Sequence, residues 1–136
     1  PQPFVAGFPT QGQNLAKLSF VAAGAAAENQ IEVKLYGTAP TADNAVWTPS
    51  FICEVRATFG TTLTGNVAPF GAADLRYADA IELLSGDTSV RIVTDTGNGI
   101  ASITLDLEGA SYLQAIVNKD GLTFAGTAYN AAVSLF

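Results

Sequence analysis

Short segments in which apolar and polar residues alternate are the feature that most constrains this chain. In residues 30–36 every second side chain is apolar, and the same alternation recurs in residues 51–59 and 100–107. A period of two is typical of a strand that has one buried face and one face in contact with water. The pattern therefore predicts an all-β protein.

Turn residues separate the alternating segments along the whole chain. Strands are predicted at seven places, namely residues 15–22, 30–36, 51–59, 89–94, 100–107, 112–117 and 127–135. Glycine and asparagine in residues 95–99 tolerate the positive φ angles of a hairpin turn. This spacing predicts a single antiparallel β-sandwich, jelly-roll or immunoglobulin-like, with about 7–8 strands. Residues 72–84 alone have helical character, and we expect a short helix or a turn there.

The length of 136 residues fits one domain with one core, which we assign to residues 15–136. Residues 1–14 precede it and contain three prolines and two glycines, which disfavour regular structure. The same segment carries Phe4, Val5 and Phe8, which need burial. We expect either a strap that packs on its own domain or an arm that reaches a neighbouring subunit, with these three residues as the candidate interface.

The charge of the chain limits its partners. The net charge is −6, and the six basic residues are scattered through the sequence. Phosphate binding needs clustered Lys and Arg, so we expect neither direct nucleic-acid binding nor binding to an anionic membrane. Only 13% of the residues are charged and 49% are hydrophobic, which favours a surface that lies against other protein.

The longest apolar stretch, residues 18–27, is about half the length that a membrane-spanning helix needs. It is followed by small residues, as in a secretory signal, but the segment before it is rich in proline and poor in basic residues. We therefore expect no transmembrane segment and no signal peptide, and synthesis in the cytoplasm of the producing cell.

The residues needed for common catalytic sites are missing from the sequence. Without histidine there is no Ser-His-Asp or Cys-His arrangement, and the usual zinc sites cannot form. Cys53 is the only cysteine and lies on the apolar face of a predicted strand, where a buried structural thiol is expected. The acids of residues 74–87 match no calcium-loop motif. We expect no enzyme, cofactor or metal site; the alternative is an enzyme that uses acids such as Asp79 and Glu82.

Trp47 is the single tryptophan and follows a polar loop, residues 37–44. One interpretation is a core or rim side chain that closes one end of the sandwich. The alternative is a ligand-stacking residue in a carbohydrate-binding or receptor-binding module.

Five segments within residues 30–136 follow one another in a fixed order, namely IEVKLYG (31–37), VWTP (46–49), GIASITLD (99–106), GASYLQA (109–115) and an alanine-rich closing strand at 126–136. In these segments and their order, the chain resembles small β-sandwich proteins in the virions of tailed bacteriophages.

This resemblance implies a structural role with no catalytic residues and no cofactor. The role is that of a capsid decoration, or cement, protein that binds the major capsid protein on the outer surface of the virion and stabilises the shell. A tail accessory protein is the alternative within the same family. A homo-oligomer, with a trimer favoured, would suit the three-fold sites of a shell.

Overall fold

The computed structural model describes residues 5–23, 29–40, 47–59, 75–95, 99–119 and 128–136. These ranges contain nine strands and no helix, and every strand pairing is antiparallel. The strands are β1 (Val5–Pro9), β2 (Leu15–Ala23), β3 (Asn29–Pro40), β4 (Trp47–Phe59), β5 (Leu75–Gly86), β6 (Arg91–Asp95), β7 (Ile100–Asp106), β8 (Tyr112–Lys119) and β9 (Ala128–Leu135). The predicted all-β, sandwich-like fold is confirmed.

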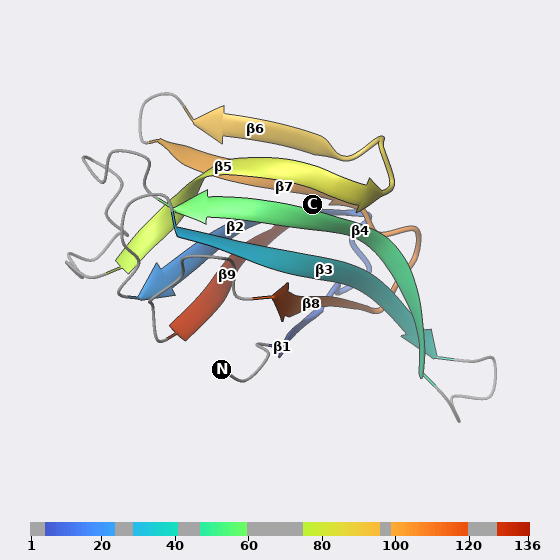
Figure 1. Ribbon diagram of the computed structural model, residues 1–136. Helices are drawn as coiled ribbons and strands as arrows, with labels where there is room; N and C mark the ends of the chain where they lie inside the picture. Colours follow the sequence, from blue (N-terminus) through green and yellow to red (C-terminus); the bar gives the residue numbers. More distant parts are fainter. Residues whose placement is uncertain (1–4, 24–28, 41–46, 60–74, 96–98, 120–127) are drawn as a thin grey trace.

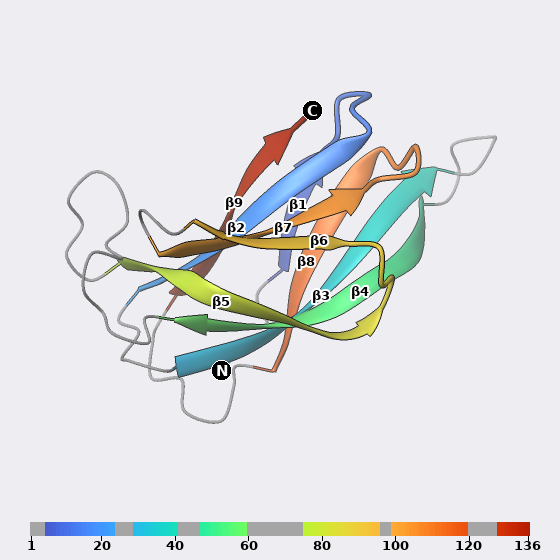
Figure 2. The same cartoon turned by 90° about the horizontal axis from the view of Figure 1, so that it is seen from above.

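The strands form one sheet that is bent but not closed (Figure 1). Its order is β1-β8-β3-β4-β5-β2-β7-β6, and β9 pairs with the other edge of β2. The bend lies in β5, where residues 75–77 pair with β2 and residues 78–86 pair with β4. The group β1-β8-β3-β4 and the group β6-β7-β2-β9 thus form two layers (Figure 2).

The core lies between these layers and is built from the alternating segments. Most of the predicted inward residues of β3, of β4, of β7 and of the position after β7 are buried, each no more than 2% exposed: Ile31, Val33, Leu35, Cys53, Val55, Ala57, Phe59, Ala101, Ile103, Leu105 and Leu107. Phe51 was predicted on the same inward face and is instead 46% exposed, because the register of β3 and β4 shifts at Ile52 and places Phe51 opposite Tyr36. Leu18 and Phe20 of β2 join the same cluster from the other layer. A fully buried side chain of this size stabilises the fold by about 1.5–3 kcal/mol. The alternation therefore predicted the buried face of β3, of β7 and of β4 from Cys53 to Phe59, and was wrong at Phe51.

The prediction of a short helix or turn near residues 72–84 is wrong for residues 75–84, which belong to β5; residues 72–74 lie outside the described ranges. Partners on β2 and β4 satisfy the backbone of β5, and Ala78 is buried in the core. Ile81 and Leu83 pack against the same core. Such tertiary pairing outweighs a weak local preference for helix.

The N-terminal segment also contributes a strand. Residues 5–9 form β1, which pairs with β8, and Phe8 packs half-buried against the core. Pro9 is accommodated because it ends an edge strand, where no ladder hydrogen bond is lost. The sheet thus begins within residues 1–14, and β1 and β5 are the two strands beyond the seven expected from the sequence.

Candidate functional site

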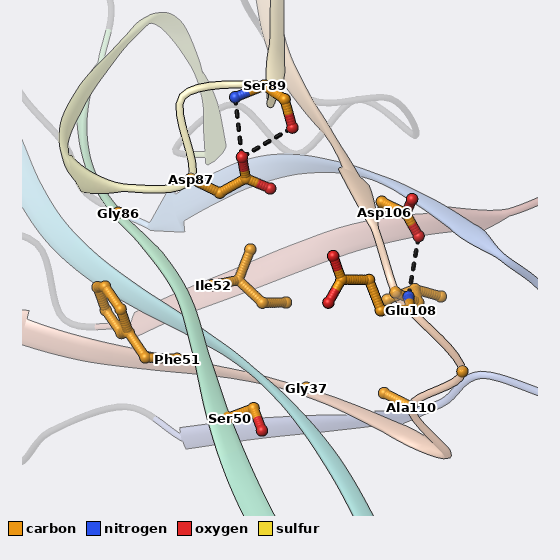
Figure 3. Close-up of a pocket in the computed structure, with 12 residues that line it drawn as sticks. Gly37, Ser50, Phe51, Ile52, Gly86, Asp87, Ser89, Asp106, Glu108 and Ala110 are labelled. Atoms are coloured by element: carbon orange, nitrogen blue, oxygen red, sulfur yellow. Dashed lines mark hydrogen bonds between the residues drawn. The ribbon is translucent and has the colours of Figure 1, made fainter.

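An open hollow of about 500 Å³ lies at one end of the sandwich (Figure 3). Four chain segments meet there: β3 at Gly37, the middle of β4, the end of β5 with the turn to β6, and the end of β7 with the turn that follows it. The hollow is lined by Gly37, Ser50, Phe51, Ile52, Gly86, Asp87, Ser89, Asp106, Leu107, Glu108, Gly109 and Ala110.

Gly86 sets how closely the end of β5 approaches β4. Its φ is +99°, and a Cβ atom there would lie 2.5 Å from the Ile52 carbonyl oxygen and 2.6 Å from the Cα of Cys53. Only glycine has both the required backbone conformation and the required size. Asp87 also holds the end of β5 close to β4, because its backbone N–H donates a 2.8 Å hydrogen bond to the Ile52 carbonyl.

Asp87 is fixed by the turn between β5 and β6. Its Oδ1 accepts hydrogen bonds from the backbone N–H of Ser89 at 2.9 Å and from the Ser89 hydroxyl at 2.7 Å. These two bonds stabilise the charged carboxylate and lower the pKa of Asp87 below its ordinary value. A negative charge therefore stands at the rim of the hollow at neutral pH.

Two further carboxylates come from the turn after β7. Asp106 Oδ1 accepts a 2.9 Å hydrogen bond from the backbone N–H of Glu108, which has a φ of +50°. The turn is anchored by Leu107, which is buried and whose N–H donates to the carbonyl of Asn14 at 2.8 Å. The side chains of Asp106 and Glu108 are consequently left exposed beside the hollow.

The opposite side of the hollow is aromatic. Phe51 is 46% exposed and packs edge-to-face on Tyr36, with ring centroids 5.6 Å apart and an interplanar angle of 68°. Figure 3 shows Phe51 on one side of the hollow and Asp106 and Glu108 on the other. The hollow thus offers oxygen acceptors and an apolar ring to a ligand. Within the described ranges, no group of three or more His, Cys, Asp or Glu side chains is arranged to hold a metal ion.

Of the predicted interface residues, Phe8 does not line this hollow. Phe4 is outside the described ranges, Val5 is the first residue of β1, and Phe8 packs on its own core. Whether Phe4, Val5 and Phe8 contact another subunit stays a prediction. Trp47 is the first residue of β4, opposite Pro40 in the register; its side chain is outside what the structure describes.

The two acids considered for catalysis do not line the hollow either. Ala78 and Ala80 of β5 pair with consecutive residues of β4, so Asp79 between them is an extra residue, as in a β-bulge. Glu82 lies opposite Arg56, with 3.7 Å between carboxylate and guanidinium, and Arg56 also binds Glu32 at 2.8 Å. Glu82 therefore belongs to a charged group on the surface of β3, β4 and β5.

Cys53 lies in the core, as predicted. Its side chain is fully buried, and this burial, with the nearby charge of Asp87 as a smaller cause, raises the pKa of the thiol to about 12. The thiol is therefore uncharged at neutral pH and a poor nucleophile.

The residues of the hollow were not predicted from the sequence. The spacings Asp87-x-Ser89 and Asp106-x-Glu108 are local signals of turns in which a carboxylate accepts from the backbone two residues later. They do not show that these two turns meet beside β4, because the order of the strands in the sheet decides that.

The fold defines this chain as an all-β, sandwich-like protein. Comparison of the chain with protein-family models, with curated proteins and with solved structures found no match. No helix in the described part of the chain is long and apolar enough to cross a membrane.

Proposed function

We propose that the chain is a non-enzymatic structural protein that acts by binding other protein, and specifically a bacteriophage capsid decoration protein that binds the major capsid protein on the outer surface of the virion. The resemblance of residues 30–136 to small virion β-sandwiches supports the specific role. The low content of charged residues supports the general role of binding other protein.

The observation that carries the proposal is the outer face of β2 and β9, called here the β2–β9 face. Lys17, Ser19 and Val21 point outward because they alternate with the buried residues of β2. In the register, Ser134 lies beside Lys17 and Ala132 lies beside Ser19. Four of these five side chains are short and uncharged, so another protein can cover them at little cost in side-chain entropy.

The mechanism of such a protein is reinforcement by binding energy. Each copy would lie over a joint between capsid subunits and contact more than one of them, so that separating the subunits breaks several interfaces together. A homo-oligomer, and in particular a trimer at a three-fold site, would multiply these contacts. Phe4, Val5 and Phe8 would add a contact to a neighbouring subunit.

The direct test uses empty shells of the phage that encodes the chain, assembled without it. We expect the purified protein to sediment with these shells and to raise their resistance to heat and denaturant. Ala132→Lys places a long charged side chain on the β2–β9 face and should weaken binding at least about tenfold. Ala80→Lys, at an exposed position of β5, is the matched control and should bind like the wild type.

Two outcomes would contradict the proposal. Folded wild-type protein that does not sediment with the shells would exclude capsid decoration. Equal loss of binding in both lysine variants would exclude the β2–β9 face as the contact surface. A variant without residues 1–8 tests the N-terminal contact, because unchanged affinity would show that the segment serves only its own domain.

The hollow supports a second candidate, a carbohydrate-binding or receptor-binding module. Phe51 offers an aromatic ring, the carboxylates of Asp87 and Glu108 offer acceptors for hydroxyl groups, and β4, which carries Phe51, begins at Trp47. A glycan array with the wild type, Trp47→Ala and Phe51→Ala separates the two candidates. Binding that is lost in these variants would favour the module, and the lack of any glycan signal would remove it.

A further inference from the structure

Strand β6 is an open edge of the second layer. It pairs only with β7 among the described strands and lies at the upper margin of the molecule in Figure 1. Residues 91–94 are all exposed. Ile92 lies opposite Ile103, which is fully buried, so the side chain of Ile92 is on the core-facing side of β6. Ile92 nevertheless remains 36% exposed. The core-facing side of β6 is therefore incompletely covered.

The sequence of β6 offers little protection of this edge beyond its short length and the charged residues at its two ends. Residues 91–95, RIVTD, contain no proline, and the pairing with β7 runs without a bulge. The three central residues are β-branched and favour strand structure. Of the other outer strands, β1 contains Gly7 and ends at Pro9, and β9, which pairs only with β2 among the described strands, is a further open edge. An open edge of this kind is a template for pairing with a further strand.

We propose that the occupant of this edge is the β6 strand of a second copy of the chain, paired antiparallel about a two-fold axis at Val93. In this register Arg91 of each copy lies opposite Asp95 of the other, so opposite charges meet at two symmetric positions. A parallel pairing in register would instead place Arg91 opposite Arg91. The charges at the two ends of β6 therefore select both the direction and the register.

In this register the two copies form one continuous sheet across the two-fold axis, and side chains of the two copies meet on both faces of that sheet. Val93 of one copy lies beside Val93 of the other, and Ile92 lies beside Thr94 of the second copy, which covers part of its exposed surface. A ladder of five residues is a small interface, so the dimer is weak and depends on concentration. The contact is isologous, so it gives a dimer. The capsid proposal favours a trimer instead. The inference of a dimer does not rest on the capsid proposal.

Analytical ultracentrifugation of the full chain tests the dimer. We expect a reversible equilibrium of monomer and dimer at concentrations up to about 1 mM. Val93→Lys places two lysines opposite each other at the two-fold axis and should weaken the dimer at least about tenfold. Ala132→Lys lies on β9, the other outer strand of this layer, and should leave the equilibrium unchanged. Circular dichroism and urea unfolding check that each variant is folded.

A charge exchange tests the register. Arg91→Asp alone and Asp95→Arg alone each place like charges opposite one another and should weaken the dimer, whereas the double variant restores the opposite pairs and should recover it. A trimer, a monomer at every concentration, a dimer that survives Val93→Lys, or a double variant that fails to recover would overturn the inference. Shell binding is a separate measurement, so failure of the dimer and failure of capsid decoration are distinguishable.

Discussion

Gly86→Ala is the substitution that tests most sharply how the hollow is built. A methyl group at this position would lie 2.5 Å from the Ile52 carbonyl oxygen and 2.6 Å from the Cα of Cys53, both of which are backbone atoms of β4. Because backbone atoms cannot turn aside as a flexible side chain can, β4 and β5 must separate to admit the methyl group. The variant should therefore fold with reduced stability and with an altered hollow.

The expected loss has two parts. The positive φ of +99° costs an alanine about 1–2 kcal/mol, and overpacking against a fixed neighbour costs about 1–3 kcal/mol. The reduced freedom of the unfolded chain returns about 0.4–1 kcal/mol. The net loss in the free energy of unfolding is thus about 1–5 kcal/mol, which at a urea m value of about 2 kcal/mol/M lowers the urea midpoint by about 0.5–2.5 M.

Gly109→Ala is the matched control, because its φ is +79° and no atom lies within 4 Å of the added methyl group. It has the cost of positive φ without the clash, so we expect a loss of only about 1 kcal/mol or less. Urea unfolding followed by circular dichroism measures both variants. If Gly86→Ala loses no more stability than Gly109→Ala, the close approach of β5 to β4 does not exist as described.

Three further predictions concern the core, the thiol and the turn. Phe59→Ala should lower the free energy of unfolding by about 3–5 kcal/mol, whereas Phe136→Ala, at a side chain that is 54% exposed, should change it by less than about 0.5 kcal/mol; similar urea midpoints for the two would contradict the burial pattern. Cys53 should react with Ellman's reagent only as the protein unfolds, because its thiol is buried and its pKa is raised to about 12, and rapid labelling of the native protein would refute this. Ser89→Ala removes the hydroxyl hydrogen bond that lowers the pKa of Asp87, so an NMR titration should show that pKa moving up towards its ordinary value. The stabilisation from charged Asp87 is present above the pKa of the unfolded chain and is lost as the pH falls through the folded pKa, so the variant should lose part of it at neutral pH, and an unchanged titration would contradict the cause assigned to the shift.

The period of two in the sequence predicted most of the core correctly because each strand buries one face, but it failed at Phe51, where the register shift at Ile52 turns the side chain outward. Cys53 is an example: its place among alternating apolar residues predicted burial, and it is fully buried. The same rule missed β5, where a register irregularity at Asp79 and the adjacent apolar residues Leu83 and Leu84 obscure the alternation. Its partners on β2 and β4, which no local pattern encodes, make it a strand.

The hollow could be predicted only in parts. Asp87 and Asp106 are recognisable turn residues, and Gly86 is recognisable as a residue suited to positive φ. Their meeting beside Phe51 depends on the bend of the sheet, which brings the turns after β5 and β7 to the same end of the sandwich. Sequence spacing carries no information about that bend.

The proposed function is tested most directly by electron cryomicroscopy of the virion in which it places this protein. Capsid decoration predicts copies on the outer surface of the capsid with the β2–β9 face against the major capsid protein, so that Ser19 and Ala132 are covered. Density for the protein on the tail, its absence from the particle, or copies bound to the shell with the β2–β9 face exposed to solvent would contradict it.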